Sequence, residues 1–241
     1  MSIPKIIHYC WFGNGEKSDI ANKCISSWKD KLMDYEIIEW NEKSFDINCN
    51  QYVKEAYELG KYAFVADYAR LYALYNYGGI YMDTDVEVIK SLDCFLQNKG
   101  VVGFESDDRV ATAIMMFEKK NELVAEWLRT YDNRKFIING KMDKTTNVSI
   151  LTKILVNSGL VLEDKYQFLE KRNIKVFSKE FFNPYSLGDK KVNISNNTYT
   201  IHWLEGTWVC GKDRVKNEII KITKAIIGKR SYEFIRQMLK K

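Results

Sequence analysis

The 241-residue chain predicts one large α/β domain built around a β-sheet. Short apolar, β-branched segments alternate with segments of helical periodicity, which is typical of a mostly parallel sheet covered by helices. The hydrophobic fraction of 46% supplies a core, and with only two prolines no Pro-rich linker divides the chain. We expect this domain to span residues 1–211 and a basic amphipathic helical tail to span residues 212–241.

The elements expected in the first half follow from periodicity and from residues that begin or end helices. Ser18 is a candidate N-cap for a helix whose apolar stripe includes Cys24 and Trp28. Gly78-Gly79 ends a later helix, because glycine accepts the left-handed conformation found after helix C-termini. The expected strands are Ile3–Phe12, Tyr35–Trp40 and Ile80–Ile89, and the other helices are Gln51–Leu59 and Tyr62–Tyr77.

The second half of the chain continues the alternation of strands and helices. It also ends in a basic segment with helical periodicity. The expected strands are Val101–Phe104, Lys175–Phe177 and Tyr199–Trp203, and the expected helices are Asn121–Tyr131, Val148–Leu155 and Val215–Leu239.

The charge of the chain is concentrated in its tail. From Lys212 onward there are ten Lys/Arg and three Asp/Glu, a balance of +7, so the net charge of +5 leaves −2 for residues 1–211. A slightly acidic body argues against a nucleic-acid binder. The Ile and Lys residues of the tail fit either an anionic membrane surface or packing of the apolar face on the domain.

Cysteine usage and hydropathy indicate the compartment. The five cysteines are an odd number and form no C-x-x-C pair, which indicates free thiols in a reducing environment. No stretch reaches the roughly 18 apolar residues of a membrane span, and the N-terminal apolar run is short for a signal peptide. We expect a cytoplasmic protein, and contact of its tail with the inner face of the plasma membrane is one of the two interpretations of that segment.

Two carboxylates, Asp83 and Asp85, follow an apolar strand. In an extended run their spacing puts both side chains on one face, at the strand end where ligands bind in open α/β sheets. Close carboxylates repel each other, and a hard cation such as Mn²⁺ or Mg²⁺ removes that cost and neutralises a leaving diphosphate. A solvated turn with two acids is the alternative interpretation of the pair taken alone.

The preceding helix carries Asp67 and Arg70 on one face of an otherwise apolar and aromatic element. A planar guanidinium beside a carboxylate, one Gly-Gly turn before the acidic pair, is suited to binding a sugar and its phosphate. An ordinary surface ion pair is the alternative.

Three segments together resemble a known family. Residues 3–13 read I-P-K-I-I-H-Y-C-W-F-G, residues 66–70 read A-D-Y-A-R, and residues 75–85 read Y-N-Y-G-G-I-Y-M-D-T-D. They are similar to the DXD-motif glycosyltransferases of the sugar-binding-region superfamily. That superfamily includes bacterial capsular polysaccharide transferases, Golgi mannosyltransferases and, more distantly, large clostridial glucosylating toxins. The similarity covers roughly the first 105 residues.

This resemblance implies a GT-A type fold, a Rossmann-like mixed sheet flanked by helices, here with a C-terminal basic helix. It also implies a metal-dependent, retaining hexosyltransferase that uses a UDP-sugar or GDP-sugar with Mn²⁺ or Mg²⁺. The acceptor would be a saccharide or lipid-linked glycan in the synthesis of capsular polysaccharide, lipopolysaccharide or another surface polysaccharide. Retention would proceed through a carboxylate nucleophile or by front-face attack.

The resemblance further assigns roles near the acidic pair. The implied catalytic residues are Asp67, Arg70, Asp83 and Asp85, where Asp85 binds the metal directly and Asp83 reaches it through water. Asp67, Arg70, Asp83 and Thr84 would also contact the donor sugar and phosphate. The donor base would stack on Trp11 in a pocket lined by Ile7, His8 and Tyr9. Core packing is the alternative for both Trp11 and His8.

Residues 202–208, H-W-L-E-G-T-W, resemble the H-x-x-x-x-S-W ending of the family. The likeness implies that His202 completes the metal shell while Thr207 and Trp208 contact the diphosphate; a buried strand histidine is the alternative. Asn147 lies where relatives often have T-G-P before a helix, whose N-terminal N–H groups can bind a donor. Glu105, after an apolar strand, faces either the acceptor or solvent.

Two other functions fit parts of the sequence. An apolar strand followed by D-x-D-V resembles the nucleophile motif of haloacid dehalogenase-like phosphohydrolases, which normally lies at the first strand rather than about eighty residues into the chain. A non-catalytic sugar-binding protein on the same fold is the second alternative. Intact Asp67, Arg70, Asp83 and Asp85 favour an enzyme.

Overall fold

The computed structural model describes residues 2–186 and 191–205. The chain divides into two compact units, Met1–Leu204 and Glu205–Lys241, and the first of these contains the sheet. The predicted basic tail and the predicted ligand contacts Thr207 and Trp208 lie outside the described residues.

Several helices begin at a residue whose side chain caps the first turn. Ser18 Oγ accepts a hydrogen bond from the Ala21 N–H at 3.2 Å, and Asn50 Oδ1 accepts one from the Val53 N–H at 2.8 Å. The helices are α1 (Asp19–Lys31), α2 (Gln51–Glu58), α3 (Tyr62–Tyr77), α4 (Glu122–Arg129), α5 (Asn147–Asn157), α6 (Lys179–Phe182) and the 3₁₀ turn η1 (Asp93–Phe95).

The central sheet is mixed and has the strand order β10-β11-β5-β7-β3-β1-β2, with β6 paired to β5. Strand β1 is parallel to both β2 and β3, and β11 is parallel to β5, whereas β7 is antiparallel to both β3 and β5. The strands of the central sheet are β1 (Ile6–Cys10), β2 (Glu36–Trp40), β3 (Gly79–Met82), β5 (Gly100–Ser106), β6 (Arg109–Val110), β7 (Ile114–Phe117), β10 (Gln167–Leu169) and β11 (Ile174–Phe177). The expected mixed α/β sheet flanked by helices is confirmed.

Among the described residues, three small two-stranded sheets accompany the central one. The strand expected over Ile80–Ile89 is divided: β3 ends at Met82, and β4 leaves the central sheet to pair with β14. The strands of the small sheets are β4 (Val86–Val88), β8 (Ile137–Ile138), β9 (Lys141–Met142), β12 (Tyr185–Ser186), β13 (Lys191–Val192) and β14 (Thr200–His202).

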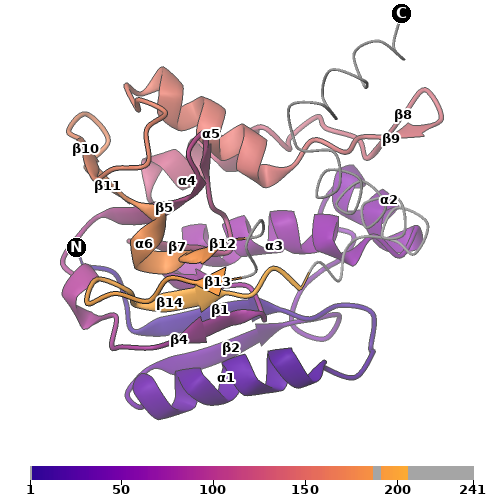
Figure 1. Cartoon of the computed structure of the whole chain (residues 1–241). Helices are drawn as coiled ribbons and strands as arrows, with labels where there is room; N and C mark the ends of the chain where they lie inside the picture. The colour runs from indigo at the N-terminus through magenta and orange to yellow at the C-terminus, as the bar shows by residue number, and fades with distance from the viewer. Residues whose placement is uncertain (1, 187–190, 206–241) are drawn as a thin grey trace, which may run out of the picture. The chain divides into compact units, whose positions relative to one another are not determined.

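Two hydrophobic cores lie on the two faces of the sheet. Alternate residues of β3 belong to different cores: Tyr81 is in the core that includes Trp127 of α4, while Ile80 and Met82 are in the core that includes Trp28 of α1. Accordingly α3, α4 and α5 gather on one side of the sheet and α1 lies on the other (Figure 1). Within the described ranges, none of the helices combines the length and apolarity needed to cross a bilayer.

The predicted Gly78-Gly79 stop is the junction between α3 and β3. Both glycines have positive φ, 69° and 105°. A Cβ on Gly79 would lie 2.5 Å from the carbonyl oxygen of Ile6, so β3 can lie against β1 only with glycine at this position. The junction thereby sets where β3 begins and where its C-terminal end delivers Asp83.

Candidate active site

Asp83, Thr84 and Asp85 form the turn that connects β3 to β4. The Asp83 N–H donates to the carbonyl of Ala113 at 2.7 Å, and the Val86 N–H donates to the carbonyl of Asp83 at 3.0 Å. The expectation of one continuous extended strand through both carboxylates is therefore wrong. A turn rather than strand alternation brings the two side chains to the same side.

Strand β14 adds a histidine to the acidic pair. His202 pairs with Val86 in the antiparallel register of β14 and β4, and the Trp203 N–H donates to the carbonyl of Asp85 at 3.0 Å. The ligand atoms of Asp83, Asp85 and His202 all lie within 4.8 Å of one another. These side chains are 29%, 14% and 12% exposed, so a ligand can still reach them.

The donor set fits a divalent cation. His202 Nε2 lies 3.3 Å from an Asp85 oxygen, whereas its Nδ1 is buried without a hydrogen-bond partner among the described residues. Two carboxylates and an imidazole are ligands that Mn²⁺ accepts. Burial opposes the charged form of His202, but Asp85, Asp83 and Glu105 outweigh it and raise the pKa of the imidazole. The cluster thus carries an excess of negative potential that a cation would neutralise.

Arg70 of α3 lies behind the acidic pair and holds it in place. Its guanidinium donates to the Thr112 carbonyl at 2.9 Å and approaches carboxylate oxygens of Asp67 at 3.1 Å and Asp83 at 3.4 Å. The side chain is only 7% exposed. In this structure Arg70 positions the carboxylates, and the predicted contact with a donor phosphate stays a prediction.

Asp67 and Tyr81 both contact the Arg70 guanidinium. Burial raises the pKa of Asp67 to about 6, although Arg70 opposes the shift. The Tyr81 ring lies 4.5 Å from the Arg70 guanidinium carbon, and the Tyr81 hydroxyl donates to Asp83 at 2.8 Å. From the sequence alone, Tyr81 is expected only as a residue of the strand before Asp83. Its position two residues before Asp83 in the quoted motif was the available signal.

Asn147 is the N-terminal residue of α5 and is almost fully buried. Its amide donates to the Asp67 carbonyl at 2.7 Å, and its side-chain oxygen accepts from Tyr131 and Trp127. The asparagine therefore ties α5 and α4 to the helix that carries Asp67. The structure does not support the predicted direct donor contact of Asn147, because its polar atoms are already engaged with protein groups.

Three of the predicted nucleotide-pocket residues, Ile7, His8 and Tyr9, belong to β1 and are buried. Ile7 and His8 have no exposed surface, so the structure does not support their predicted contact with a donor. His8 Nε2 donates to the Gly78 carbonyl at 2.8 Å and Nδ1 accepts from the Trp40 indole at 3.2 Å, as expected of a satisfied core histidine. Tyr9 is also buried, with its hydroxyl donating to Glu39.

Trp11 lies beyond the C-terminal end of β1 and is partly exposed. Its indole N–H donates to the Gly15 carbonyl at 2.7 Å, which fixes the ring without enclosing it. The proposed stacking of a nucleotide base on this ring stays a prediction.

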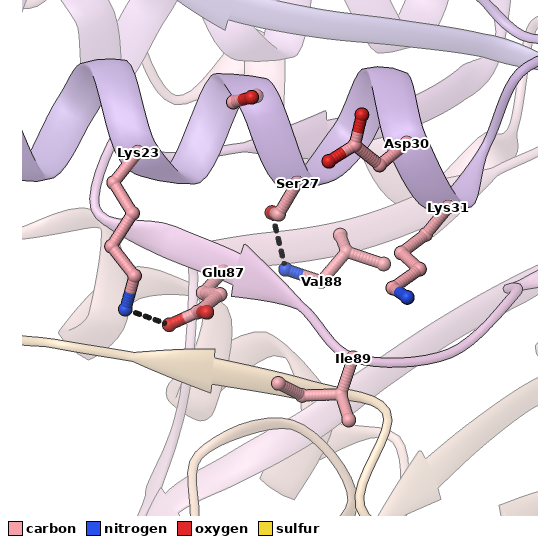
Figure 2. A pocket seen from close by; sticks show the side chains of 8 residues that line it. Lys23, Ser27, Asp30, Lys31, Glu87, Val88 and Ile89 are labelled. Carbon is pink, nitrogen blue, oxygen red and sulfur yellow. Dashed lines mark hydrogen bonds and ion pairs between the residues drawn. The ribbon is translucent and has the colours of Figure 1, made fainter.

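A separate hollow of about 510 Å³ lies between α1 and β4 (Figure 2). Lys23 Nζ is 2.9 Å from Glu87, and Ser27 Oγ accepts from the Val88 N–H at 2.9 Å. The predicted site residues do not line this hollow. It is distinct from the cluster of Asp83, Asp85 and His202.

The fold and the site define an α/β protein with a cluster of two carboxylates and a histidine at the point where the chain leaves the central sheet after β3. Residues 18–102 match the sequence model of the glycosyltransferase sugar-binding region containing a DXD motif. Over this segment, about a third of its length, the chain is similar to the DXD-motif glycosyltransferases.

Two curated relatives match this chain over part of their length. The chain is 30% identical over 139 residues to inositol phosphoceramide mannosyltransferase 3 of Schizosaccharomyces pombe, covering 53% of this chain and 37% of the relative. It is 37% identical over 79 residues to the uncharacterized protein At4g19900 of Arabidopsis thaliana, covering 31% of this chain and 12% of that protein. The chain thus spans well under half of the length of either relative.

Solved glycosyltransferase structures also resemble the chain at low identity. PaToxG glycosyltransferase gives a TM-score of 0.48 at 18% identity, over 66% of this chain and 70% of that chain. A glycosyltransferase involved in glycosylation of the PBCV-1 major capsid gives 0.44 at 11% identity, over 89% and 98%.

Proposed function

We propose that this protein is a metal-dependent glycosyltransferase that moves a hexose from a nucleoside-diphosphate donor to a glycan or lipid-linked acceptor. The observation that carries the proposal is the convergence of Asp83, Asp85 and His202 within 4.8 Å at the edge of the sheet. These three residues would hold Mn²⁺ or Mg²⁺. The cation, when bound, would neutralise the charge that develops on the departing diphosphate.

The protein groups supply positioning and a preorganised field. Arg70 donates to the Thr112 carbonyl and lies 3.1 Å from an Asp67 oxygen and 3.4 Å from an Asp83 oxygen, so it links the two carboxylates. Because Asp67 is 13% exposed and next to the cluster, it can accept hydrogen bonds from the donor sugar. Trp11, at the end of the neighbouring strand, offers a face for the nucleotide base. The donor would therefore lie along the C-terminal ends of β1 and β3.

The proposed transfer retains the anomeric configuration. In the front-face route the acceptor oxygen forms a bond to the anomeric carbon on the side from which the diphosphate departs. The bond between that carbon and the diphosphate oxygen breaks, and its electron pair leaves with the diphosphate. The acceptor proton passes to the departing phosphate oxygen. Stabilisation of the leaving group by a fixed electrostatic environment is then the main catalytic contribution.

The proposed cellular role is surface polysaccharide synthesis at the cytoplasmic side of the plasma membrane. The basic composition of residues 212–241 supports peripheral contact with anionic lipid. The similarity to inositol phosphoceramide mannosyltransferase 3 of Schizosaccharomyces pombe supports testing GDP-mannose first.

A screen of UDP-hexoses and GDP-hexoses tests the donor. The full chain is incubated with each donor and Mn²⁺, and release of nucleoside diphosphate is measured with and without saccharide acceptors. We expect one donor class to be turned over and the release to increase when an acceptor is added. A chain that hydrolyses small phosphoesters but releases nucleoside diphosphate from none of these donors would instead be a phosphohydrolase, and the proposal would be wrong.

A further inference from the structure

Strand β5 ends in a bulge at Glu105. Phe104 pairs with Val110 and Ser106 pairs with Arg109, so β5 advances two residues where β6 advances one. Glu105 is therefore the extra residue of the bulge. Bulges turn a side chain away from the regular alternation of a strand and are frequent beside active sites.

The sheet brings this bulge to the edge that carries the acidic pair. Because β7 is antiparallel to both β3 and β5, those two strands run in the same direction and end at the same edge. Residues 111–113, which lie between β6 and β7, form hydrogen bonds with the ends of both β3 and β5. The Ala111 N–H donates to the Gly103 carbonyl at 2.8 Å, and the Asp83 N–H donates to the Ala113 carbonyl at 2.7 Å.

The Glu105 carboxylate is close enough to His202 and Asp83 for their charges to act on it. It is partly buried, and within residues 2–186 and 191–205 no hydrogen bond or ion pair to it is seen. Burial raises its pKa, and the charges of His202 and Asp83 also act on it. A half-buried carboxylate without a hydrogen-bond donor costs free energy. A ligand hydroxyl that donates to Glu105 would remove that cost.

Sheet order separates Glu105 from the donor side. From Asp83 at the end of β3, strand β1 with Trp11 lies in one direction and β5 with Glu105 lies in the other. Glu105 also lies outside the set of three residues whose ligand atoms converge. A donor held along β1 and β3 leaves this side of the cluster for the second substrate.

We propose that Glu105 binds the acceptor, its carboxylate accepting a hydrogen bond from a hydroxyl of the saccharide that receives the sugar. This inference rests on the proposed glycosyltransferase function. Because Glu105 adds a carboxylate beside Asp83 and Asp85, this subsite favours a neutral, hydroxyl-rich acceptor over one carrying a uronate or phosphate at the same position.

The test separates acceptor use from donor use in the full chain. Glu105→Gln, Glu105→Ala and the control Asp108→Asn are compared with the wild type using the donor found by the screen. Asp108 is 71% exposed in the same hairpin and accepts a hydrogen bond from Ser106 Oγ at 2.9 Å, so Asp108→Asn removes a nearby negative charge and keeps an acceptor oxygen for that bond. Two rates are measured: donor hydrolysis by water alone, and transfer to a panel of methyl hexosides.

Donor hydrolysis by both Glu105 variants is expected to change much less than transfer does, because the donor lies on the other side of the cluster and Glu105 acts on His202 only through its charge. The acceptor KM should rise at least roughly tenfold in Glu105→Ala, as expected for loss of a charged hydrogen-bond partner. Glu105→Gln keeps an acceptor oxygen, so its KM should lie between those of Glu105→Ala and wild type. Asp108→Asn should match wild type.

An unchanged acceptor KM in a folded Glu105→Ala protein, with normal wild-type turnover, would overturn the acceptor role alone. An equal loss of hydrolysis and transfer would also overturn it, because Glu105 would then act on the donor. A covalent sugar adduct on Glu105 would assign it to a nucleophile role instead. If the wild-type chain turns over no nucleotide sugar, the proposed function fails and this inference fails with it.

Discussion

At the scale of single residues, Arg70 shows how one buried cation can organise an acidic site. Its guanidinium reaches Asp67, Asp83 and the Thr112 carbonyl from fixed directions, and it lies against the Tyr81 ring. A lysine ammonium keeps the charge but lacks the planar fork that serves several acceptors at once. The geometry therefore depends on arginine specifically.

Arg70→Lys is expected to lower the free energy of unfolding by roughly 1–3 kcal/mol, because at least one buried acceptor loses its donor. Donor turnover should fall about a hundredfold, since Asp83 is no longer held. Urea unfolding and nucleoside diphosphate release measure the two effects. Arg109→Lys, at an arginine 63% exposed, is the matched control. Wild-type turnover in Arg70→Lys would contradict the positioning role.

His8 predicts a pH dependence of stability that is separate from the site. Burial lowers its pKa from 6.5 to about 4 in the folded protein, despite the bond to the Gly78 carbonyl. Between these values the unfolded chain binds the proton and the folded chain does not. The stabilisation is therefore complete above about pH 6.5 and is lost as the pH falls toward 4.

The expected loss between these pH values is about 3 kcal/mol. The change that isolates it is His8→Gln, which cannot titrate, so its stability should fall less steeply with acid than that of wild type. The measurement is urea unfolding at several pH values between 4 and 7, comparing slopes rather than absolute stabilities. Parallel slopes for the two proteins would show that His8 does not carry this dependence.

At the scale of elements, the α3–β3 junction determines where Asp83 is delivered. Gly79 has a φ of 105° and no room for a Cβ, which would lie 2.5 Å from the Ile6 carbonyl oxygen. Gly140, at the β8–β9 turn, has a φ of 74° and open space around it. Substitution at Gly140 therefore reports backbone strain alone, whereas substitution at Gly79 reports strain together with a steric clash.

Gly79→Ala should therefore destabilise the protein by more than about 3 kcal/mol, because a clash with backbone adds to the strain. Gly140→Ala should cost about 1–2 kcal/mol from the left-handed conformation alone. Chemical unfolding of both variants gives the comparison. Equal losses would mean that the close approach of β3 to β1 contributes nothing.

Elements with local signals were predictable from the sequence, and elements set by distant partners were not. The helix after Ser18 and the helix ending at Gly78 have their caps and stops in the sequence itself. Strand β7, Ile114–Phe117, is buried on both sides, so four apolar residues show no alternation. The break of the expected strand at Asp83 arises because β4 pairs with β14, more than a hundred residues later.

The same distinction holds for the site. Asp83 and Asp85 are recognisable from their motif, and the convergence of His202 with them was anticipated from the resemblance. The engagement of Asn147 by Asp67, and the bulge that turns Glu105, depend on contacts between remote segments. No local pattern in the sequence encodes those contacts.

At the scale of the whole molecule, the proposed cation would join segments far apart in sequence. Asp83 and Asp85 follow β3, whereas His202 belongs to β14. A ligand that binds only the folded chain stabilises it by mass action. Metal binding should therefore be visible in the global unfolding transition, independently of any substrate.

Mn²⁺ at about a hundred times its dissociation constant should raise the free energy of unfolding by roughly 2.7 kcal/mol. Asp85→Asn should lose most of this gain, whereas Asp46→Asn, at an exposed loop carboxylate, should keep it. Thermal unfolding with and without Mn²⁺ measures the difference. An equal Mn²⁺ effect on wild type and Asp85→Asn would place the cation elsewhere.

The most direct measurement is donor turnover by the wild-type chain and Asp85→Asn across a titration of Mn²⁺, with a chelator as the zero point. Wild-type release of nucleoside diphosphate should rise with Mn²⁺ and fall to background with the chelator. Asp85→Asn, folded by circular dichroism, should stay at least about a hundredfold lower, because the cluster loses a charged ligand. Wild-type-like turnover in Asp85→Asn, or turnover unaffected by the chelator, would contradict a metal-dependent glycosyltransferase site at Asp83, Asp85 and His202.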